Sequence, residues 1–233
     1  MRIKIFLDGA DLSAMTAARA SGRVKGFTTN PSLMRRAGIT DYKAFALKAI
    51  AVIPDLPISF EVFSDDFATM EREAREIASW GGDTYVKIPI SNTKGDSAAP
   101  LIRKLSAEGF SLNVTAILTL DQVQAVADAV TLASRTIVSV FAGRIADTGM
   151  DPIPIMADSA RALARLTKAE LLWASSREFL NVIQAEQCGC HIITATPDII
   201  AKLPSFGKDL HKVSLDTVKT FYEDARASGF KIV

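Results

Sequence analysis

The chain has 233 residues, 48% of them hydrophobic, and its 27 basic and 26 acidic residues leave a net charge of +1. This composition suits one globular domain with a large core, and a near-neutral chain without a basic stripe is not expected to bind nucleic acid. No apolar run reaches the roughly 18 residues that would span a membrane, and the apolar N-terminal run is too short for a signal peptide, so we expect a cytoplasmic protein with no membrane partner.

Apolar runs of strand length alternate with amphipathic segments of helix length, and the pattern occurs eight times. Strands are predicted near residues 3–8, 25–30, 58–64, 84–90, 111–118, 136–142, 169–175 and 191–196. Helices are predicted near residues 11–21, 31–53 (broken at Gly38), 66–80, 97–109, 120–134, 153–168, 177–188, 197–203 and 210–227. Apolar strands joined by crossover helices indicate a parallel sheet, and eight such units favour an α/β fold of the (β/α)8 TIM-barrel type.

A doubly wound open sheet is the alternative fold. It usually carries a glycine-rich phosphate loop after its first strand, and Asp8-Gly9-Ala10-Asp11 matches that loop poorly. No linker or low-complexity stretch interrupts the chain, so we expect residues 1–233 to form a single TIM-barrel domain.

Cysteine and histidine, two of the common metal ligands, are scarce. Cys188 and Cys190 are one residue apart, a spacing that disfavours a disulfide, and two thiols do not make a zinc site. His191 and His211 are the only histidines, and they belong to no ligand-like cluster. We therefore expect reduced thiols and no metal site.

Polar residues recur at the carboxyl ends of the predicted strands, where barrels of this type place their active sites. They are Asp8, Thr28, Thr29, Asn30, Glu61, Lys87, Asn113, Thr115, Ser139, Ser175 and Arg177. Strand side chains alternate between faces, so residues two apart share a face, as in the pairs Asn113 with Thr115, Ser139 with Phe141, and Ser175 with Arg177. Each residue alone has a structural explanation, but a set on nearly every strand predicts one polar site.

Lys87 lies inside an apolar strand, Tyr85-Val86-Lys87-Ile88-Pro89-Ile90. Burying an unpaired ammonium is costly, so a lysine in such a place readily becomes the neutral amine that attacks carbonyl groups. The residue is therefore a candidate for Schiff-base formation. The alternative is a strand-end lysine whose stem is buried and whose charged head reaches water.

The other polar residues suggest partners for this amine. Asp8 and Glu61 supply two carboxylates, the minimum for separate proton transfers. Arg144, Arg177 and Ser175 could hold a phosphate, although each arginine alone could equally be a surface residue. Because both arginines follow strands six and seven, near the usual phosphate site of barrels, the set predicts Schiff-base carbon–carbon chemistry on a phosphorylated sugar.

Seven segments, in order, resemble the transaldolase family, specifically the short subfamily shared with fructose-6-phosphate aldolase. They are Phe6-Leu7-Asp8, Thr28-Thr29-Asn30-Pro31-Ser32, Glu61-Val62, Val86-Lys87-Ile88-Pro89, Asn113-Val114-Thr115, Ser139-Val140-Phe141-Ala142-Gly143-Arg144-Ile145 and Ala174-Ser175-Ser176-Arg177. The second and fourth segments are the most specific, and they occur together.

The resemblance implies catalytic roles. Lys87 would form the Schiff base with C2 of a ketose phosphate, and Asp8 would take the C4 hydroxyl proton as the C3–C4 bond breaks. Glu61, with Thr115 and a water, would shuttle protons as the Schiff base forms and breaks down. The substrate-binding set that it implies is Asn30, Thr29, Asn113, Ser139, Phe141, Arg144, Ser175 and Arg177. Of these, Arg144, Ser175 and Arg177 would hold the phosphate.

The resemblance also implies substrates and partners. The donor would be fructose 6-phosphate or sedoheptulose 7-phosphate, and a dihydroxyacetone unit would pass to an aldose phosphate, as in the pentose phosphate pathway. No metal or organic cofactor would be needed, because the iminium is the electron sink. The subfamily typically forms pentamers or decamers, so the C-terminal helix, about residues 209–229, would pack on a neighbouring subunit. The alternative is an ordinary eighth barrel helix.

Two positions favour transfer over simple cleavage. Fructose-6-phosphate aldolase has glutamine where Glu61 stands and tyrosine where Phe141 stands. An aldolase that releases free dihydroxyacetone remains one alternative, and a catalytically idle barrel that binds phosphorylated sugars is another. An idle barrel, however, would have no reason to keep an unpaired buried lysine. Val140, Trp173 and Ser176 depart from the family pattern near the phosphate side, which leaves the preferred sugar open.

Overall fold

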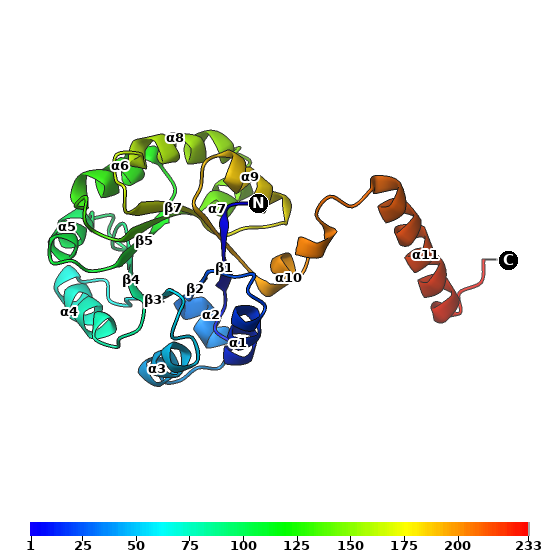
Figure 1. Cartoon of the computed structure of the whole chain (residues 1–233), viewed down its shortest axis with the longest axis horizontal. Helices are drawn as coiled ribbons and strands as arrows, with labels where there is room; N and C mark the ends of the chain where they lie inside the picture. Colours follow the sequence, from blue (N-terminus) through cyan, green and yellow to red (C-terminus); the bar gives the residue numbers. More distant parts are fainter. Residues whose placement is uncertain (233) are drawn as a thin grey trace. The chain divides into compact units, whose positions relative to one another are not determined.

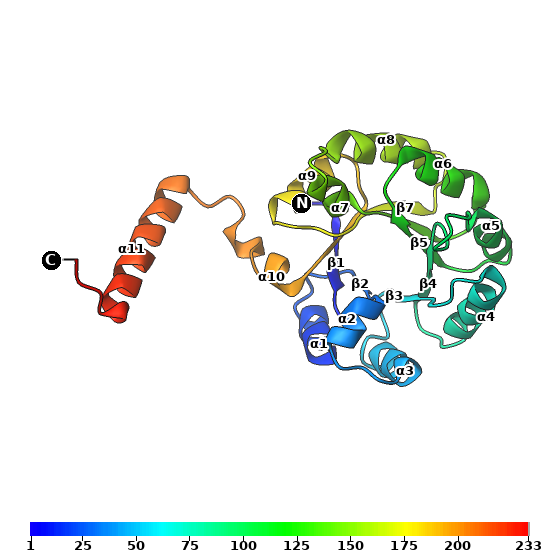
Figure 2. The ribbon, with the colours of Figure 1, turned by 180° about the vertical axis from the view of Figure 1, so that it is seen from behind.

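A computed structural model describes residues 1–232 and divides the chain into two compact units, residues 1–200 and a C-terminal unit that begins at Ala201. In the first unit, eight parallel strands close into a barrel in sequence order, with helices outside them (Figures 1 and 2). The strands are β1 (Lys4–Asp8), β2 (Gly26–Thr28), β3 (Ile58–Glu61), β4 (Thr84–Pro89), β5 (Leu112–Ile117), β6 (Thr136–Val140), β7 (Ala169–Trp173) and β8 (Ile192–Ala195). The predicted (β/α)8 barrel is therefore confirmed.

The helices follow the predicted order, with one addition. They are α1 (Leu12–Ala20), α2 (Pro31–Arg36), α3 (Tyr42–Val52), α4 (Phe67–Ala78), α5 (Ala99–Ala107), α6 (Leu120–Ala129), α7 (Ala142–Asp147), α8 (Ile153–Leu163), α9 (Leu180–Gln187), α10 (Pro197–Ile200) and α11 (Leu210–Ser228), with a 3-10 turn at Leu203–Ser205. The break at Gly38 is confirmed, and its φ of +70° suits glycine. Helix α7 was not predicted, because six residues are too few to establish a helical period.

Local sequence explains where several of these helices begin and end. Asp11, Asn30, Asp41 and Asp66 each accept a hydrogen bond from the backbone N–H three residues on, which caps α1, α2, α3 and α4. Helix α6 ends at Ala129 rather than near residue 134, because Val130 is already extended at ψ 149°.

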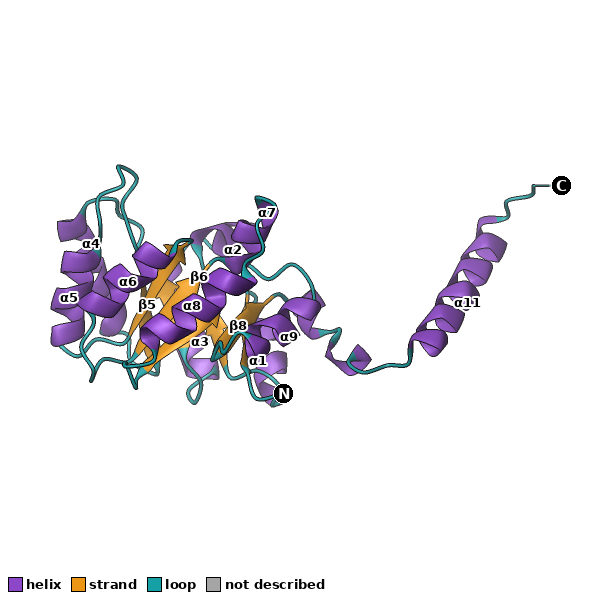
Figure 3. Ribbon diagram, turned by 90° about the horizontal axis from the view of Figure 1, so that it is seen from above, coloured by secondary structure: helices purple, strands orange, loops and turns teal. Residues whose placement is uncertain are grey.

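The barrel interior has an apolar floor below a polar layer. Phe6 packs in a buried cluster with Tyr85, Ile137, Leu172, Ala174 and Ile192. Its ring occupies the space next to Gly26, where a Cβ would lie 2.5 Å from the ring. Because alternate strand residues share a face, Asp8 stands above Phe6 on the same inward side of β1. Figure 3 shows the strands, in orange, enclosed by the helices in purple.

The C-terminal unit contains the longest helix described, α11, which begins with the Asp209 side chain capping the Lys212 N–H and ends at Gly229, φ +67°. The helix predicted near residues 210–227 is confirmed. It exposes Leu210, Val213, Leu215, Val218, Phe221 and Tyr222. That residues 1–233 form one domain, and that this helix packs on a neighbour, stay predictions. Over residues 1–232, no helix combines the length and apolar character needed to cross a bilayer.

Candidate active site

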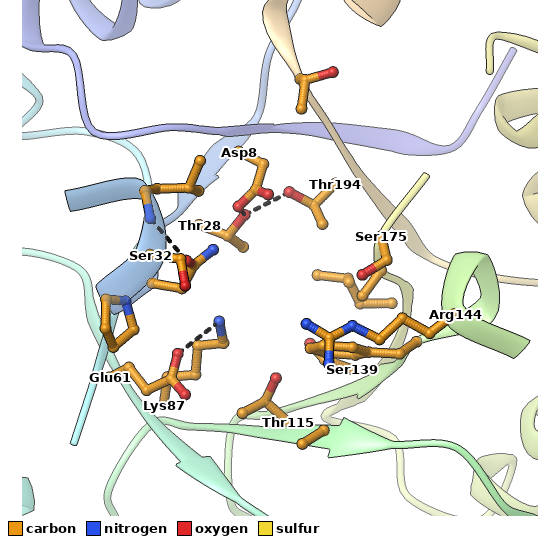
Figure 4. A pocket seen from close by; sticks show the side chains of 18 of the residues that line it. Asp8, Thr28, Ser32, Glu61, Lys87, Thr115, Ser139, Arg144, Ser175 and Thr194 are labelled. Atoms are coloured by element: carbon orange, nitrogen blue, oxygen red, sulfur yellow. Dashed lines mark hydrogen bonds and ion pairs between the residues drawn. The ribbon is translucent and has the colours of Figure 1, made fainter. Parts of the chain in front are cut away.

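A cavity of about 520 Å³ opens where the strands of the barrel end. All eight strands contribute to its lining, through Asp8, Thr28, Glu61, Lys87, Thr115, Ser139, Leu172 and Thr194. Its volume lies in the usual range for a small-molecule site, roughly 300–1,000 Å³. The polar ends of these strands therefore converge as expected from the sequence (Figure 4).

Most of the predicted site residues line this cavity, and three do not. Those that line it are Asp8, Asn30, Glu61, Lys87, Thr115, Ser139, Phe141, Arg144 and Ser175. The side chains of Thr29, Asn113 and Arg177 are not part of the lining.

Lys87 projects into the cavity from β4 beside Glu61, its register partner on β3 (Figure 4). Its Nζ lies 3.0 Å from Oε2 of Glu61 and donates a hydrogen bond to the Thr29 carbonyl oxygen at 3.1 Å. The two side chains are only 8% and 17% exposed. The hydroxyl of Tyr42 donates to the carbonyl oxygen of Glu61 at 3.0 Å, which holds this end of β3. The expectation of an unpaired lysine is thus wrong, because the neighbouring strand supplies a carboxylate.

Asp8 points into the same cavity from β1, beside Thr28 and Thr194 (Figure 4). Its Oδ1 accepts a hydrogen bond from the Thr28 hydroxyl at 2.8 Å. Burial raises the pKa of Asp8 above its usual value, and the charge of Lys87 and the bond from Thr28 only partly offset this effect. The carboxylates of Glu61 and Asp8 therefore share one cavity with the Lys87 amine. Glu61 is paired with Lys87, whereas Asp8 is hydrogen-bonded to Thr28.

Asn113 lies below the lining and is fully buried. Its Nδ2 donates to the Ser59 hydroxyl at 2.9 Å, and its Oδ1 accepts from the Ser139 hydroxyl at 2.7 Å. These bonds fix Ser139, which does line the cavity. Thr29 is also turned away, because its hydroxyl donates to the Ser59 carbonyl oxygen at 2.8 Å. On the cavity side, Thr29 contributes its backbone carbonyl oxygen, which accepts the hydrogen bond from Lys87.

Asn30 lines the cavity and also caps helix α2. Its Oδ1 accepts the N–H of Leu33 at 3.0 Å. The amide nitrogen is then the part of this side chain that can donate to a ligand.

Arg144, on α7, reaches into the cavity from the side opposite Lys87 (Figure 4). Its guanidinium lies over the Phe141 ring, 4.9 Å from the centroid, which orients the charge. Ser175 stands next to it. Helix α7 and Ser175 are in close contact, because a Cβ at Gly143 would lie 1.6 Å from the Ser175 carbonyl oxygen. Only glycine fits at this position.

Arg177 lies outside the cavity and is exposed. Its guanidinium donates to both carboxylate oxygens of Asp147, at 3.0 and 2.5 Å, and these bonds lower the pKa of Asp147. The alternation that paired Arg177 with Ser175 does not apply, since β7 ends at Trp173 and Ser175 has a φ of +60°. A left-handed residue turns the chain and breaks the period of two.

Within residues 1–232, two non-glycine residues have a positive φ, Ala116 at 59° and Ser175 at 60°, and both line the cavity. Such conformations cost about 1–3 kcal/mol each and are concentrated at functional sites. Ala116 belongs to an irregularity in β5, between Val114 and Ile117. Beside it, the Thr115 hydroxyl is buried and has no hydrogen-bond partner within residues 1–232, so it is free to bind a ligand or a water.

Sequence reasoning missed four polar residues of the lining, Ser32, Arg36, Thr194 and Thr196. Ser32 and Arg36 follow Asn30 on α2, a helix that begins directly at the cavity. Thr194 lies in the eighth strand and Thr196 directly follows it, and the other seven strands also carry polar residues at or just after their ends. The recurrence of polar residues at strand ends could therefore have indicated Thr194 and Thr196 from the sequence. Among the described residues, no group of three or more histidine, cysteine, aspartate or glutamate side chains could hold a metal ion.

The model of the transaldolase/fructose-6-phosphate aldolase family matches residues 5–232. The chain belongs to this family. Among relatives of this transaldolase/aldolase chain, a protein of Thermoanaerobacter sp. (strain X514) named "Probable transaldolase" is 35% identical over 99% of this chain and 100% of its own length. A protein of the same name from Streptococcus equi subsp. zooepidemicus (strain MGCS10565) is 37% identical over 95% of this chain and 97% of its own.

Solved structures of lower similarity support the fold of this family member. The 4-hydroxy-tetrahydrodipicolinate synthase of Methylacidiphilum fumariolicum SolV has a TM-score of 0.56 at 13% identity, covering 84% of this chain and 68% of that one. At that identity the likeness concerns the barrel alone. The resemblance to the transaldolase/aldolase family inferred from sequence is confirmed by the family match and by the relatives.

Proposed function

We propose that this member of the family is a transaldolase. It moves a dihydroxyacetone unit from a ketose phosphate, fructose 6-phosphate or sedoheptulose 7-phosphate, to an aldose phosphate through a Schiff base on Lys87. The observation that carries the proposal is the buried amine of Lys87, 3.0 Å from Glu61 inside a cavity that Asp8 also enters. Family membership independently supports chemistry of the transaldolase or aldolase type.

Glu61 is the base for the first step. Lys87 must lose a proton before its nitrogen can attack C2 of the ketose, and Glu61 Oε2 is within hydrogen-bond reach of that proton. The same carboxyl group then relays this proton, and a second one from the nitrogen of the carbinolamine, to the C2 oxygen, which leaves as water when the iminium forms. The Thr115 hydroxyl, buried in the lining without a partner in the described chain, is suited to hold that water.

Asp8 serves the next step. Its carboxylate takes the proton of the C4 hydroxyl, the C3–C4 bonding pair moves into the iminium to give an enamine, and the aldose phosphate leaves. With the acceptor aldehyde the same steps run in reverse, and Asp8 returns its proton to the new hydroxyl. A pKa raised by burial suits a group that alternates between base and acid.

Arg144 and Ser175 are the residues we assign to the substrate phosphate, with Arg177 in a lesser role. Because a hydrogen bond to a charged group contributes about 1.5–3 kcal/mol, Arg144→Ala is expected to raise KM for a phosphorylated donor roughly 10- to 100-fold. Arg177→Ala should have a smaller effect, since Asp147 already holds its guanidinium. Steady-state kinetics with fructose 6-phosphate measures both. Equal losses with unphosphorylated fructose would contradict the assignment.

An aldolase that releases free dihydroxyacetone is the alternative, because the family includes both activities. Phe141 lines the cavity and has no acidic proton, so we expect the enamine to wait for an acceptor aldehyde. Phe141→Tyr places a phenol there and should increase release of dihydroxyacetone. Product analysis of the wild type and this variant without an acceptor checks the prediction. Rapid release by the wild type itself would favour the aldolase.

The cellular setting is also a proposal. We infer a cytoplasmic enzyme of carbohydrate metabolism, active in the pentose phosphate pathway as the family resemblance implies. We further infer a homo-oligomer, a pentamer or decamer, in which α11 packs on a neighbouring subunit. The exposed apolar side chains of α11, Val218 and Phe221 among them, support such a contact because water is a poor environment for them.

A further inference from the structure

Three side chains from three neighbouring strands form a continuous hydrogen-bonded chain that ends on Asp8. The Thr28 hydroxyl of β2 donates to Asp8 Oδ1 of β1 at 2.8 Å, and the Thr28 and Thr194 hydroxyl oxygens are 2.5 Å apart. Thr194 comes from β8, on the other side of β1 (Figure 4). Thr28 is 3% exposed and Thr194 is 5% exposed, so water competes little for these bonds.

The number of protons decides the direction of this chain. Thr28 has one hydroxyl proton, and while Asp8 is ionised that proton lies on the bond to the carboxylate. The short contact to Thr194 must then use the Thr194 proton, so Thr194 donates to Thr28 and Thr28 donates to Asp8. An incoming hydrogen bond polarises a hydroxyl and makes it a better donor.

We propose that Thr194 is a positioning residue that, through Thr28, orients the Asp8 carboxylate and stabilises its ionised form. The catalytic role of Asp8 rests on the proposed function, whereas the hydrogen bonds from Thr194 to Thr28 and from Thr28 to Asp8 do not depend on it. When Asp8 takes up a proton, both hydroxyls can rotate, so that Asp8 donates to Thr28 and Thr28 donates to Thr194. Both protonation states are then hydrogen-bonded without movement of a heavier atom.

Other charged groups also act on Asp8, and the hydrogen-bonded hydroxyls oppose those influences that disfavour its ionised form. Lys87 on β4 favours the carboxylate, whereas Glu61 on β3 disfavours it. Arg36 and Arg144 line the same cavity. Thr28, itself hydrogen-bonded to Thr194, supplies the only hydrogen bond to the Asp8 carboxylate described in residues 1–232, in a cavity where burial opposes ionisation.

The test compares Thr194→Val, which removes the hydroxyl, with Thr194→Ser, which keeps it. In the full-length protein with ¹³C-labelled aspartate, NMR follows the carboxyl carbon of Asp8, assigned by its absence in Asp8→Asn. Without the hydrogen bond from Thr194, Thr28 is a weaker donor to the ionised form of Asp8, which should raise the pKa of Asp8 by about 0.5–1 unit. Thr194→Val should show this rise, and the acid limb of kcat/KM should move to higher pH by the same amount. Thr194→Ser should restore both values.

Several results would overturn the proposal. An unchanged Asp8 titration in Thr194→Val would do so, even if turnover fell, because the residue would then only pack. A serine variant that behaves like the valine variant would point to the methyl group instead of the hydroxyl. If valine prevents folding, Thr194→Ala gives the same comparison. A wild type without turnover on any ketose, but with the shift in Thr194→Val, would support the positioning role and refute the proposed function.

Discussion

Replacing Lys87 by alanine is expected to lower kcat for sugar transfer roughly 10⁴-fold or more, because no other group can take over the covalent step. It should also abolish trapping of the intermediate. Borohydride reduction in the presence of fructose 6-phosphate, followed by intact and peptide mass spectrometry, should place a three-carbon adduct on Lys87 of the wild type. The same treatment of Lys87→Ala should leave the chain unmodified.

Lys168→Ala is the matched control, since Lys168 is an exposed lysine outside the cavity lining. It should keep both turnover and the adduct. Thermal unfolding of Lys87→Ala is needed beside it, because that variant leaves Glu61 part-buried without its cation. An adduct with another ketose but not with fructose 6-phosphate would keep the mechanism and change the donor. No adduct with any ketose would favour the barrel that only binds sugar phosphates.

Asp8→Asn should block the reaction one step later than Lys87→Ala. Lys87 and Glu61 are intact in this variant, so the Schiff base should still form, while cleavage of the C3–C4 bond loses its base and kcat falls by about 10²–10⁴-fold. Borohydride should therefore trap the whole six-carbon donor on Lys87 instead of the three-carbon unit. The mass of the adduct distinguishes the two directly.

The pH dependence of donor cleavage should change with it. The carboxylate of Asp8 is the active form, and burial raises its pKa, so kcat/KM of the wild type should fall as the pH drops through that raised value. Asp8→Asn should lack this acid limb. Asp11→Asn, which replaces an exposed helix cap by another good cap, is the control for a nearby loss of charge. A three-carbon adduct at the wild-type level in Asp8→Asn would refute the role of Asp8.

The barrel could be predicted because its signal is repeated. Each strand is an apolar run and most helices begin at a capping residue such as Asp66, so eight weak indications support one another. The short helix α7 has neither a capping side chain nor enough residues to show a helical period, so it was not predicted. This omission affected the prediction of the site. Arg144 lies on α7, so its approach to the cavity over Phe141 could not be deduced from strand periodicity.

The candidate site was predictable to the extent that strands stay regular. Asp8 and Glu61 end regular strands and Lys87 lies two residues before the end of another, and the alternation of side chains brings them into one cavity. The rule fails where the backbone departs from extended geometry. Ser175 has a left-handed φ, and Arg177 beyond it therefore lies on Asp147 outside the cavity.

The order of strands and helices, and the polar residues at the ends of the strands, can be deduced from the sequence because they depend on local periodicity and on neighbours along the chain. Which of those residues touch depends on how the barrel closes. Closure of the barrel places β8 beside β1, which brings Thr194 to Thr28 and so to Asp8 across 166 and 20 residues of chain. It also pairs Lys87 with Glu61. Such contacts arise from register and twist between distant segments, which a single sequence does not display.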